Sequence, residues 1–389
     1  MRYVGAPQAR LDWAVGLPGT ESILFGRGTA DSIGESMSGL GKKALVVTGK
    51  SAIRSGLRDR AVSQLNDAGI DSVFFDGVGS NPTMGSVDSG AGTAVSEGCD
   101  CVLVIGGGSQ IDAAKAMALV AGNGGSVRDY LGGKGNVPGL KALPVVAVAT
   151  TCGTGSEVNG ICVLTDEETR DKGGMTSRTV VPKTSIVDPA LMETMPPTIM
   201  ASVSFDAFCH LAESYISGGR DEYTDGICAN GLSLLSMYLL RANRDIHDVH
   251  ALDAVCMAST MAGIVIYKAG TTAPHALEHP LSGLRNIPHG EGLAAVSPEI
   301  YRRCSSALPD RFSEMSRMFG GKDHSDFDSA VTRITAELGI DRTLSELGFG
   351  SDDIPWLTDS AVRNAGSKFG RHPVPMDRDV TESIYRAIL

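Results

Sequence analysis

The sequence predicts two domains: an α/β N-terminal domain with a Rossmann-like, mostly parallel sheet over residues 1–192, and an all-α C-terminal domain over residues 193–389. Two observations support this prediction. In the first half, short apolar runs alternate with helical patterns, which is typical of βα units and a parallel sheet. After Asp188-Pro189 these runs disappear and helical periodicity dominates the chain.

The strands expected in the N-terminal domain are compact apolar runs, a pattern typical of buried strands. They lie at residues 22–26, 43–49, 72–76, 101–105 and 145–149. Helices are expected between them, up to about residue 68, over 85–97 and over 110–121.

The C-terminal domain is expected to begin at Met195-Pro196-Pro197, because proline is favoured in the first turn of a helix. Predicted helices cover residues 197–217, 224–241, 248–268, 293–304, 325–338 and 353–366.

Composition narrows the functional classes. The net charge of −11 argues against nucleic acid as a partner, because phosphate binding needs a basic surface. The eight cysteines form no Cys-x-x-Cys pair, and most lie in apolar runs, as expected of buried thiols in a reducing compartment. Neither a signal peptide nor an uninterrupted run of 18 apolar residues is recognisable, so we expect a cytoplasmic protein with no membrane span.

Two pairs of side chains have the spacing of a metal site. His275 and His279 are four residues apart and would share one helix face, and His289 lies in a predicted turn just beyond. Asp206 and His210 have the same four-residue spacing. Three imidazoles and one carboxylate, without thiolate, suit Fe(II) or Zn(II). The alternative is that these are surface histidines or histidines satisfied within the core.

Two loops rich in glycine and hydroxyl groups predict a phosphate-binding edge. Gly106-Gly107-Gly108-Ser109 separates a strand from a helix, whose first N–H groups can receive a pyrophosphate. Residues 150–157 form a second such turn at the carboxyl end of another strand, where open α/β sheets bind ligands. Each loop alone could be an ordinary βα turn, but together they favour a dinucleotide site. Lys172 could contact phosphate or ribose, although a solvated lysine is the simpler interpretation.

Five motifs, in this order and spacing, resemble those of the iron-containing (group III) alcohol dehydrogenases over nearly the whole chain. They are Gly106-Gly107-Gly108-Ser109 with Asp112 and Lys115; Thr150-Thr151 through Glu157; Asp188-Pro189 with Met195-Pro196-Pro197; Asp206-Ala207 with His210 and Glu213; and His275 through His289-Gly290. The resemblance implies a dehydroquinate-synthase-like architecture and a homodimer or larger homo-oligomer.

The resemblance also implies roles for individual residues. The metal ligands would be Asp206, His210, His275 and His289, and His279 would be a catalytic, non-ligating histidine. We take His279 as a proton relay, with an orienting residue as the alternative. Glu213, about one turn beyond His210, is expected to be a simple helix-face carboxylate, with a partner that holds one of the ligands as the alternative. Expected contacts to NAD(P) come from Gly49, Lys50, Ser51, Asn81, Gly107, Gly108, Ser109, Asp112, Thr150, Thr151, Thr154, Lys172 and Leu191.

The implied reaction is hydride transfer between a small alcohol or aldehyde and a nicotinamide, with Fe(II), or Zn(II) in the same place, acting as a Lewis acid. Gly49-Lys50-Ser51 stands where NAD-using relatives often carry aspartate. Its lack of negative charge favours NADP, or use of both cofactors, unless Lys50 simply points to solvent.

Cations around the expected substrate site depart from the family pattern. Candidate substrate contacts are Asn159, Lys268, Thr272, Arg285, Lys368 and Arg371. The four cations among them suggest a substrate that carries a carboxylate, sulfonate or phosphonate, of the sulfo- or phosphonoacetaldehyde type. The alternative is that they are surface cations or bind the cofactor phosphate.

Two alternative functions are disfavoured by the sequence. A metal-free reductase of the same architecture, resembling maleylacetate reductase, is disfavoured by the intact set of four ligands. A non-enzymatic nucleotide- or metal-binding protein is disfavoured because two loops and a ligand set occur in one chain.

Overall fold

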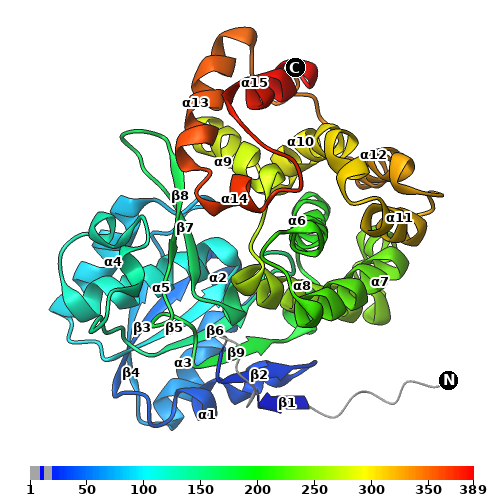
Figure 1. Cartoon of the computed structure of the whole chain (residues 1–389). Helices are drawn as coiled ribbons and strands as arrows, with labels where there is room; N and C mark the ends of the chain where they lie inside the picture. The colour runs from blue at the N-terminus through cyan, green and yellow to red at the C-terminus, as the bar shows by residue number, and fades with distance from the viewer. Residues whose placement is uncertain (1–8, 13–19) are drawn as a thin grey trace. The chain divides into compact units, whose positions relative to one another are not determined.

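The computed structural model describes residues 9–12 and 20–389, which form two compact units. Unit 1 contains the described residues up to Thr151 together with Gly155–Thr169 and Gly173–Thr194. Unit 2 contains Met195–Leu389 and two short segments, Cys152–Thr154 and Arg170–Lys172. The predicted fold class, a parallel α/β part followed by an all-α part, is confirmed (Figure 1).

Unit 1 is built on a seven-stranded sheet in which six strands are parallel and one edge strand is antiparallel. In spatial order the strands are β1 (Ala9–Asp12), β2 (Ser22–Phe25), β9 (Thr184–Val187), β6 (Val145–Ala149), β5 (Cys101–Gly106), β3 (Lys43–Thr48) and β4 (Asp71–Phe75). β5 and β6 are buried along their whole length, as their unbroken apolar sequences predict.

Helices cover the sheet of unit 1 (Figure 1). They are α1 (Ile33–Met37), α2 (Lys50–Arg54), α3 (Leu57–Asp67), α4 (Met84–Ser96) and α5 (Gly108–Asn123). α1 and α3 pack on one set of alternating strand side chains, represented by Val46 and Leu103, in a common core. α5 packs on β5 and β6 and is almost entirely buried, which explains its alanine-rich sequence.

All five expected strands are present, but four further strands among the described residues, β1, β7, β8 and β9, were not predicted. β9 occupies a central place in the sheet, although only Ile186 and Val187 in it are apolar. β7 (Ile161–Thr165) and β8 (Lys172–Thr176) form a separate two-stranded sheet. The helix expected up to about residue 68 is two helices, because Gly56 adopts a left-handed conformation with φ of 73° between them.

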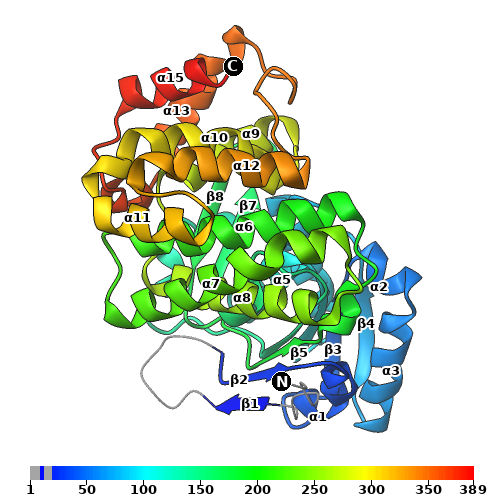
Figure 2. The same cartoon turned by 90° about the vertical axis from the view of Figure 1, so that its right-hand side faces the viewer.

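Unit 2 is helical. Its helices are α6 (Pro197–Ile216), α7 (Glu222–Arg244), α8 (Val249–Lys268), α9 (Ala273–Arg285), α10 (His289–Cys304), α11 (Pro309–Met318), α12 (Phe327–Leu338), α13 (Ile354–Asn364), α14 (Ser367–Arg371) and α15 (Arg378–Ala387). Figure 2 shows α7 and α8 side by side, and both pack against α6. α11, α14 and α15 were not predicted.

α8 is, among the described residues, the one helix long and apolar enough to cross a membrane, with a mean hydropathy of 1.7. More than half of this apolar stretch is buried inside the protein. Core helices of globular proteins satisfy the same criterion, and α8 packs against α6 and α7 as such a helix does.

Two clusters hold α9 and α10, which carry histidines of the predicted site. Leu277 of α9 packs with Leu357 of α13 and Ile384 of α15, and the Tyr385 hydroxyl donates to the carbonyl of Leu277 at 2.6 Å. An aromatic cluster of Phe205, Phe208, Tyr301, Phe312, Phe319 and Phe327 joins α6 and α10 to the helices that follow. The site is therefore mounted on packed helices.

Candidate functional site

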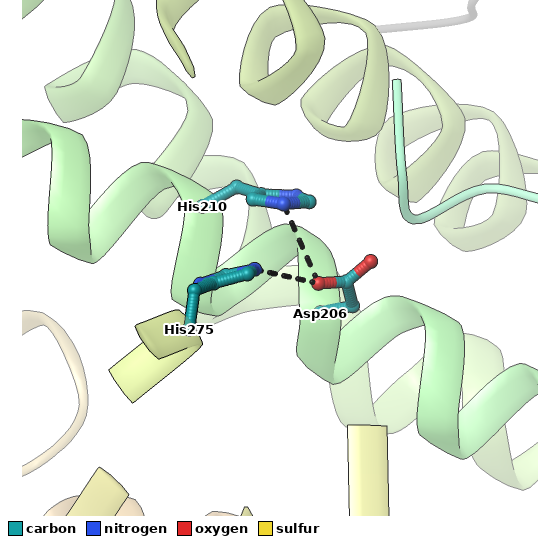
Figure 3. Close-up of side chains that lie close together, drawn as sticks. All are labelled: Asp206, His210 and His275. Atoms are coloured by element: carbon teal, nitrogen blue, oxygen red, sulfur yellow. Dashed lines mark ion pairs between the residues drawn. The ribbon is translucent and has the colours of Figure 1, made fainter. Parts of the chain in front are cut away.

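In unit 2 the three predicted histidine ligands lie around one carboxylate oxygen of the fourth, Asp206. Oδ1 of Asp206 lies 3.5 Å from Nε2 of His210, 3.4 Å from Nε2 of His275 and 3.7 Å from Nε2 of His289. Figure 3 shows three of the four side chains. Ligand atoms about 2.1 Å from one tetrahedral ion are about 3.4 Å apart, so the spacing of Asp206, His210 and His275 fits donors around a single cation. These separations are too long for good hydrogen bonds. His289 also lies in a neighbouring group with Glu278 and His279.

The local sequence explains how each side chain is positioned. α6 presents Asp206 and His210 one turn apart on one face. α9 places His275 in its first turn, directly after Pro274. His289 opens α10, and was wrongly expected in a turn before that helix. The Gly290 N–H donates to Oγ of Ser202 at 3.1 Å, which ties the start of α10 to α6.

Gly290 also has a steric role. A Cβ atom at this position would lie 2.0 Å from the backbone carbonyl oxygen of Ser202. Only glycine therefore allows α10 to begin against α6 at this distance, and this contact fixes the position of His289.

Each imidazole is held from its other nitrogen. Nδ1 of His275 donates to Oε1 of Glu213 at 2.5 Å, and Nδ1 of His289 pairs with Oε2 of Glu278. Nδ1 of His210 lies 3.4 Å from the carbonyl oxygen of Gly153. These partners leave the Nε2 lone pairs directed toward Asp206, as outer partners of metal-bound histidines do.

Two buried glutamates hold histidines of the set: Glu213 takes the less favoured of its two expected roles, and Glu278 was not singled out from the sequence. Glu213 was expected to be a simple helix-face carboxylate, but it is fully buried and also accepts the N–H and the hydroxyl of Thr272 at 2.7 and 3.2 Å. Its seven-residue distance from Asp206 puts both on one face of α6 and could have identified it. Glu278 lies three residues after His275 and offers the same kind of signal.

Charge and burial suit a cation at this position. Burial raises the pKa of the Asp206 carboxyl, but the surrounding imidazoles outweigh burial and hold that pKa far below its ordinary value. Burial lowers the pKa of His210 to about 4. Oδ1 of Asp206 and Nε2 of His275 are buried without a hydrogen-bond partner among the described residues. Such orphaned atoms are costly, and a bound cation would satisfy both.

His279 lies beside the ligand set. Its ring is 5.8 Å from that of His289 and 6.2 Å from that of His275, and it is buried. Burial first, and then the nearby ammonium groups of Lys368 and Lys172, hold the pKa of His279 well below its ordinary value. A neutral imidazole in this position can accept a proton.

The predicted substrate cations separate into two classes. Lys268 forms an ion pair with Asp221, and Arg285 pairs with Asp353 at 2.6 Å while its guanidinium lies over the ring of Phe349. These partners account for both charges on the surface, so the expectation that they contact the substrate is not supported. Lys368 and Arg371 form neither hydrogen bonds nor ion pairs through their side chains with any residue in the described ranges.

Other predicted contacts also have structural partners. The solvated interpretation of Lys172 is wrong, because this residue is buried in unit 2 and its Nζ donates to Oγ of Ser282 at 3.0 Å. Asn159 is buried and its amide closes its own loop through Gly155 and Ile161, which does not support a substrate contact. Thr272, which is fully buried, donates to Glu213 and thereby positions it.

In unit 1 three predicted loops meet at one edge of the sheet, at the carboxyl ends of β3, β5 and β6. The Gly49 N–H donates to the carbonyl of Ile105 at 3.3 Å, and the Thr150 N–H donates to that of Gly106 at 3.0 Å. A Cβ atom at Gly107 would lie 3.0 Å from Oγ1 of Thr151. The loops thus surround the N-terminus of α5, whose Gly108 and Ser109 N–H groups have no acceptor within the helix.

The remaining predicted cofactor residues are distributed differently. Lys50 and Ser51 are exposed at the start of α2, directly after β3. Asn81 follows Ser80, whose carbonyl accepts the Ser109 hydroxyl, so it lies next to the α5 N-terminus. Thr154 belongs to unit 2. Leu191 packs against the core of unit 1.

Asp112 has a bracing role within unit 1. One carboxylate oxygen accepts the Val163 N–H at 2.8 Å, and the other accepts the Ser156 hydroxyl and lies 3.2 Å from Nζ of Lys115. Lys115 is fully buried and donates to the carbonyl of Ser156 at 2.9 Å. This network joins α5 to the second glycine-rich loop and occupies both oxygens of Asp112.

Comparisons with known proteins identify the family to which the chain is similar. The family model described as iron-containing alcohol dehydrogenase matches residues 20–189, and that of the Fe-containing alcohol dehydrogenase family, C-terminal, matches residues 199–389. The chain is 33% identical to a 1,3-propanediol dehydrogenase of Citrobacter freundii over 375 residues, covering 94% of this chain and 96% of the relative.

Solved structures show the same similarity. An archaeal halo-thermophilic alcohol dehydrogenase from a Red Sea brine pool superposes with a TM-score of 0.92 at 33% identity, covering 98% of this chain and 100% of that one. A sulfoacetaldehyde reductase from Bifidobacterium kashiwanohense, in complex with NAD⁺, superposes with a TM-score of 0.85 at 29% identity, covering 97% and 99%.

Proposed function

The chain belongs to the iron-containing alcohol dehydrogenase family, and from this premise we propose that it is a metal-dependent, NAD(P)-linked alcohol dehydrogenase or aldehyde reductase. The oxidoreductase class follows from the family. The metal, the cofactor and the substrate are the parts we propose here.

One observation carries the metal dependence. Three imidazole Nε2 atoms lie 3.4 to 3.7 Å from a single buried carboxylate oxygen that has no hydrogen-bond partner among the described residues. Asp206, His210, His275 and His289 would hold the ion. The N/O donor set suits Fe(II), and Zn(II) could take the same place. When bound, such an ion polarises the substrate oxygen as a Lewis acid.

The chain's own residues would perform the remaining tasks. Glu213 and Glu278 keep the Nε2 lone pairs of their histidines available. His279, held neutral by burial and nearby ammonium groups, would accept the alcohol proton during oxidation and return it during reduction. Asp206, His210 and His275 are buried, which would limit the access of water to the metal.

For the cofactor we propose NADP, or use of both NADP and NAD. The loops around the α5 N-terminus would hold the pyrophosphate, because their backbone N–H groups and glycines suit a close-lying anion. Lys50 is exposed at the start of α2 and carries the positive charge that a 2′-phosphate would contact. The relative solved in complex with NAD⁺ supports a nicotinamide cofactor.

For the substrate we propose a small alcohol or aldehyde, including those that carry an anionic group, of the sulfo- or phosphonoacetaldehyde type. Relatives named for 1,3-propanediol and for sulfoacetaldehyde support small substrates of both neutral and charged kinds. We further propose a cytoplasmic homodimer or larger homo-oligomer. All eight cysteines are free and buried, which supports a reducing compartment.

The test is aldehyde-dependent oxidation of NADPH and NADH by purified enzyme before chelation, after chelation and after reconstitution with Fe(II) or Zn(II). We expect activity to disappear on chelation and to return with the metal. Full activity after exhaustive chelation would instead identify a metal-free reductase of the same architecture.

A further inference from the structure

We propose that Lys368 and Arg371, on the short helix α14, bind the anionic group of the substrate and make the enzyme selective for small aldehydes and alcohols that carry a sulfonate, phosphonate or carboxylate. This inference rests on the proposed function and assigns its substrate class to particular side chains.

The first argument is the balance of charge. Lys268 and Arg285, the other cations singled out in unit 2, each have a carboxylate partner, at Asp221 and Asp353. Lys368 and Arg371 have no such partner in the part of the chain that the structure describes. Both side chains are only partly exposed, so their charges are partly removed from water without a carboxylate partner among the described residues, a cost that a ligand of opposite charge would offset.

The second argument is the location of Lys368. Lys368 is half-buried on α14, which packs against α9, the helix that carries His275 and His279. In agreement with this packing, its ammonium group lowers the pKa of His279 and is attracted by the carboxylate of Glu213. Burial lowers the pKa of Lys368 itself to about 8, which leaves the side chain mostly protonated at neutral pH. The helix α14 therefore places an ammonium group near the helix of His275 and His279, with no side-chain hydrogen bond or ion pair to any described residue.

The third argument is the space that the Arg371 side chain occupies. A Cβ atom at Gly270 would lie 1.8 Å from Nη1 of Arg371, and one at Gly219 would lie 3.3 Å from its Nε. The backbone carbonyl of Arg371 also accepts the Gly218 N–H at 2.8 Å. Two glycines thus make room for the guanidinium. Gly270, with φ of 72°, lies two residues before Thr272, the partner of Glu213.

The fourth argument is His372, which follows Arg371. It is only 8% exposed, and neither ring nitrogen has a hydrogen-bond partner among the described residues. The same turn therefore supplies an ammonium group, a guanidinium with a planar fork of donors and a buried imidazole, all without partners. An oxyanion with two or three oxygens can accept from such a set.

The experiment compares kcat/KM of the metal-loaded enzyme for three anionic aldehydes and one neutral aldehyde of similar length. The anionic substrates are sulfoacetaldehyde, phosphonoacetaldehyde and succinate semialdehyde, and the neutral one is butanal. We expect wild type to prefer at least one anionic aldehyde over butanal by 10-fold or more, and the best one identifies the group. Lys368→Met and Arg371→Leu should each reduce this preference by about 10- to 100-fold, the range for lost charge-assisted hydrogen bonds.

Lys268→Met and Arg285→Gln are the matched controls, because both remove a cation of unit 2 that already has a carboxylate partner. Both should keep the wild-type preference. Arg371→Lys, which preserves the charge but not the fork, should keep part of it.

A measurement on wild type avoids dependence on variant folding. Methanesulfonate, methylphosphonate or acetate should inhibit aldehyde reduction competitively with the aldehyde, and inhibition should weaken in Lys368→Met. An active wild-type enzyme that prefers butanal, or that none of the three anions inhibits, overturns this inference alone. Absence of turnover with every aldehyde overturns the proposed function as well.

Discussion

Oε1 of Glu213 accepts a hydrogen bond from Nδ1 of His275 at 2.5 Å, and this contact fixes which nitrogen of His275 faces Asp206. Both side chains are buried. Removing the carboxylate charge should therefore weaken metal binding without removing a ligand.

Glu213→Gln should lower metal affinity by about 10- to 100-fold, as loss of an outer partner of a metal-bound histidine does. The measurement is a competition titration with a chromogenic chelator. Glu222→Gln, at an exposed position in the first turn of α7, is the control and should keep wild-type affinity. Unchanged affinity in Glu213→Gln would show that His275 does not bind metal through the nitrogen assigned here.

His279→Gln should separate proton transfer from metal binding. If His279 is a relay and not a ligand, kcat should fall by about 100-fold or more while metal content remains that of wild type. The checks are steady-state kinetics together with elemental analysis of the same preparation. A variant that loses its metal would assign His279 to the ligand set instead.

Gly290→Ala should displace the start of α10, because its Cβ would lie 2.0 Å from the Ser202 carbonyl oxygen. We expect a lower Tm and a lower metal content, since His289 moves with the helix. Gly226→Ala, in α7, is the control: a Cβ there meets no atom within 4 Å, so stability should stay within about 1 kcal/mol or rise. Wild-type metal content in Gly290→Ala would contradict the positional role of this glycine.

The ion pair between Asp166 and Arg128 in unit 1 should make the stability of the protein depend on pH. Hydrogen bonds from the Arg128 guanidinium, one of them at 2.7 Å, lower the pKa of the Asp166 carboxyl from 3.8 to about 2. Because the pKa is lower in the folded state, the pair's contribution to stability is complete above about pH 4 and is lost as the pH falls toward 2.

The Tm difference between wild type and Asp166→Asn should therefore shrink over that interval. Thermal scans between pH 7 and pH 2 measure it. Asp59→Asn, which alters an exposed carboxyl group, should give a Tm difference that does not change in this way. A difference for Asp166→Asn that stays constant down to pH 2 would show that Arg128 does not shift this carboxyl.

The sequence predicted the strands and ligands that have strong local signals. Buried strands such as 101–105 consist of unbroken apolar residues, and Asp206 and His210 follow a helical spacing. β9 was missed because half of its four residues are polar, and its neighbours in the sheet, not its own pattern, make it a strand. Tertiary context overrides local propensity in such a case.

The site shows the same division between local and distant information. Whether a cation is free or paired depends on partners that are far away in the chain: Lys268 meets Asp221 and Arg285 meets Asp353. No local pattern distinguishes these two cations from Lys368. The hydrogen bonds of Glu213 to His275 and Thr272 likewise join α6 to a segment about 60 residues later, which explains why the sequence alone did not favour this role.

The central place of β9 has a consequence for biosynthesis. β2 is among the earliest strands to leave the ribosome, yet its parallel neighbour in the sheet is β9, which begins only at Thr184. β6 must wait for the same partner on one side. The nascent chain therefore exposes an open strand edge until that segment emerges, a state in which strands can pair with other chains. Completion of the sheet, and with it protection from self-association, should come late in translation.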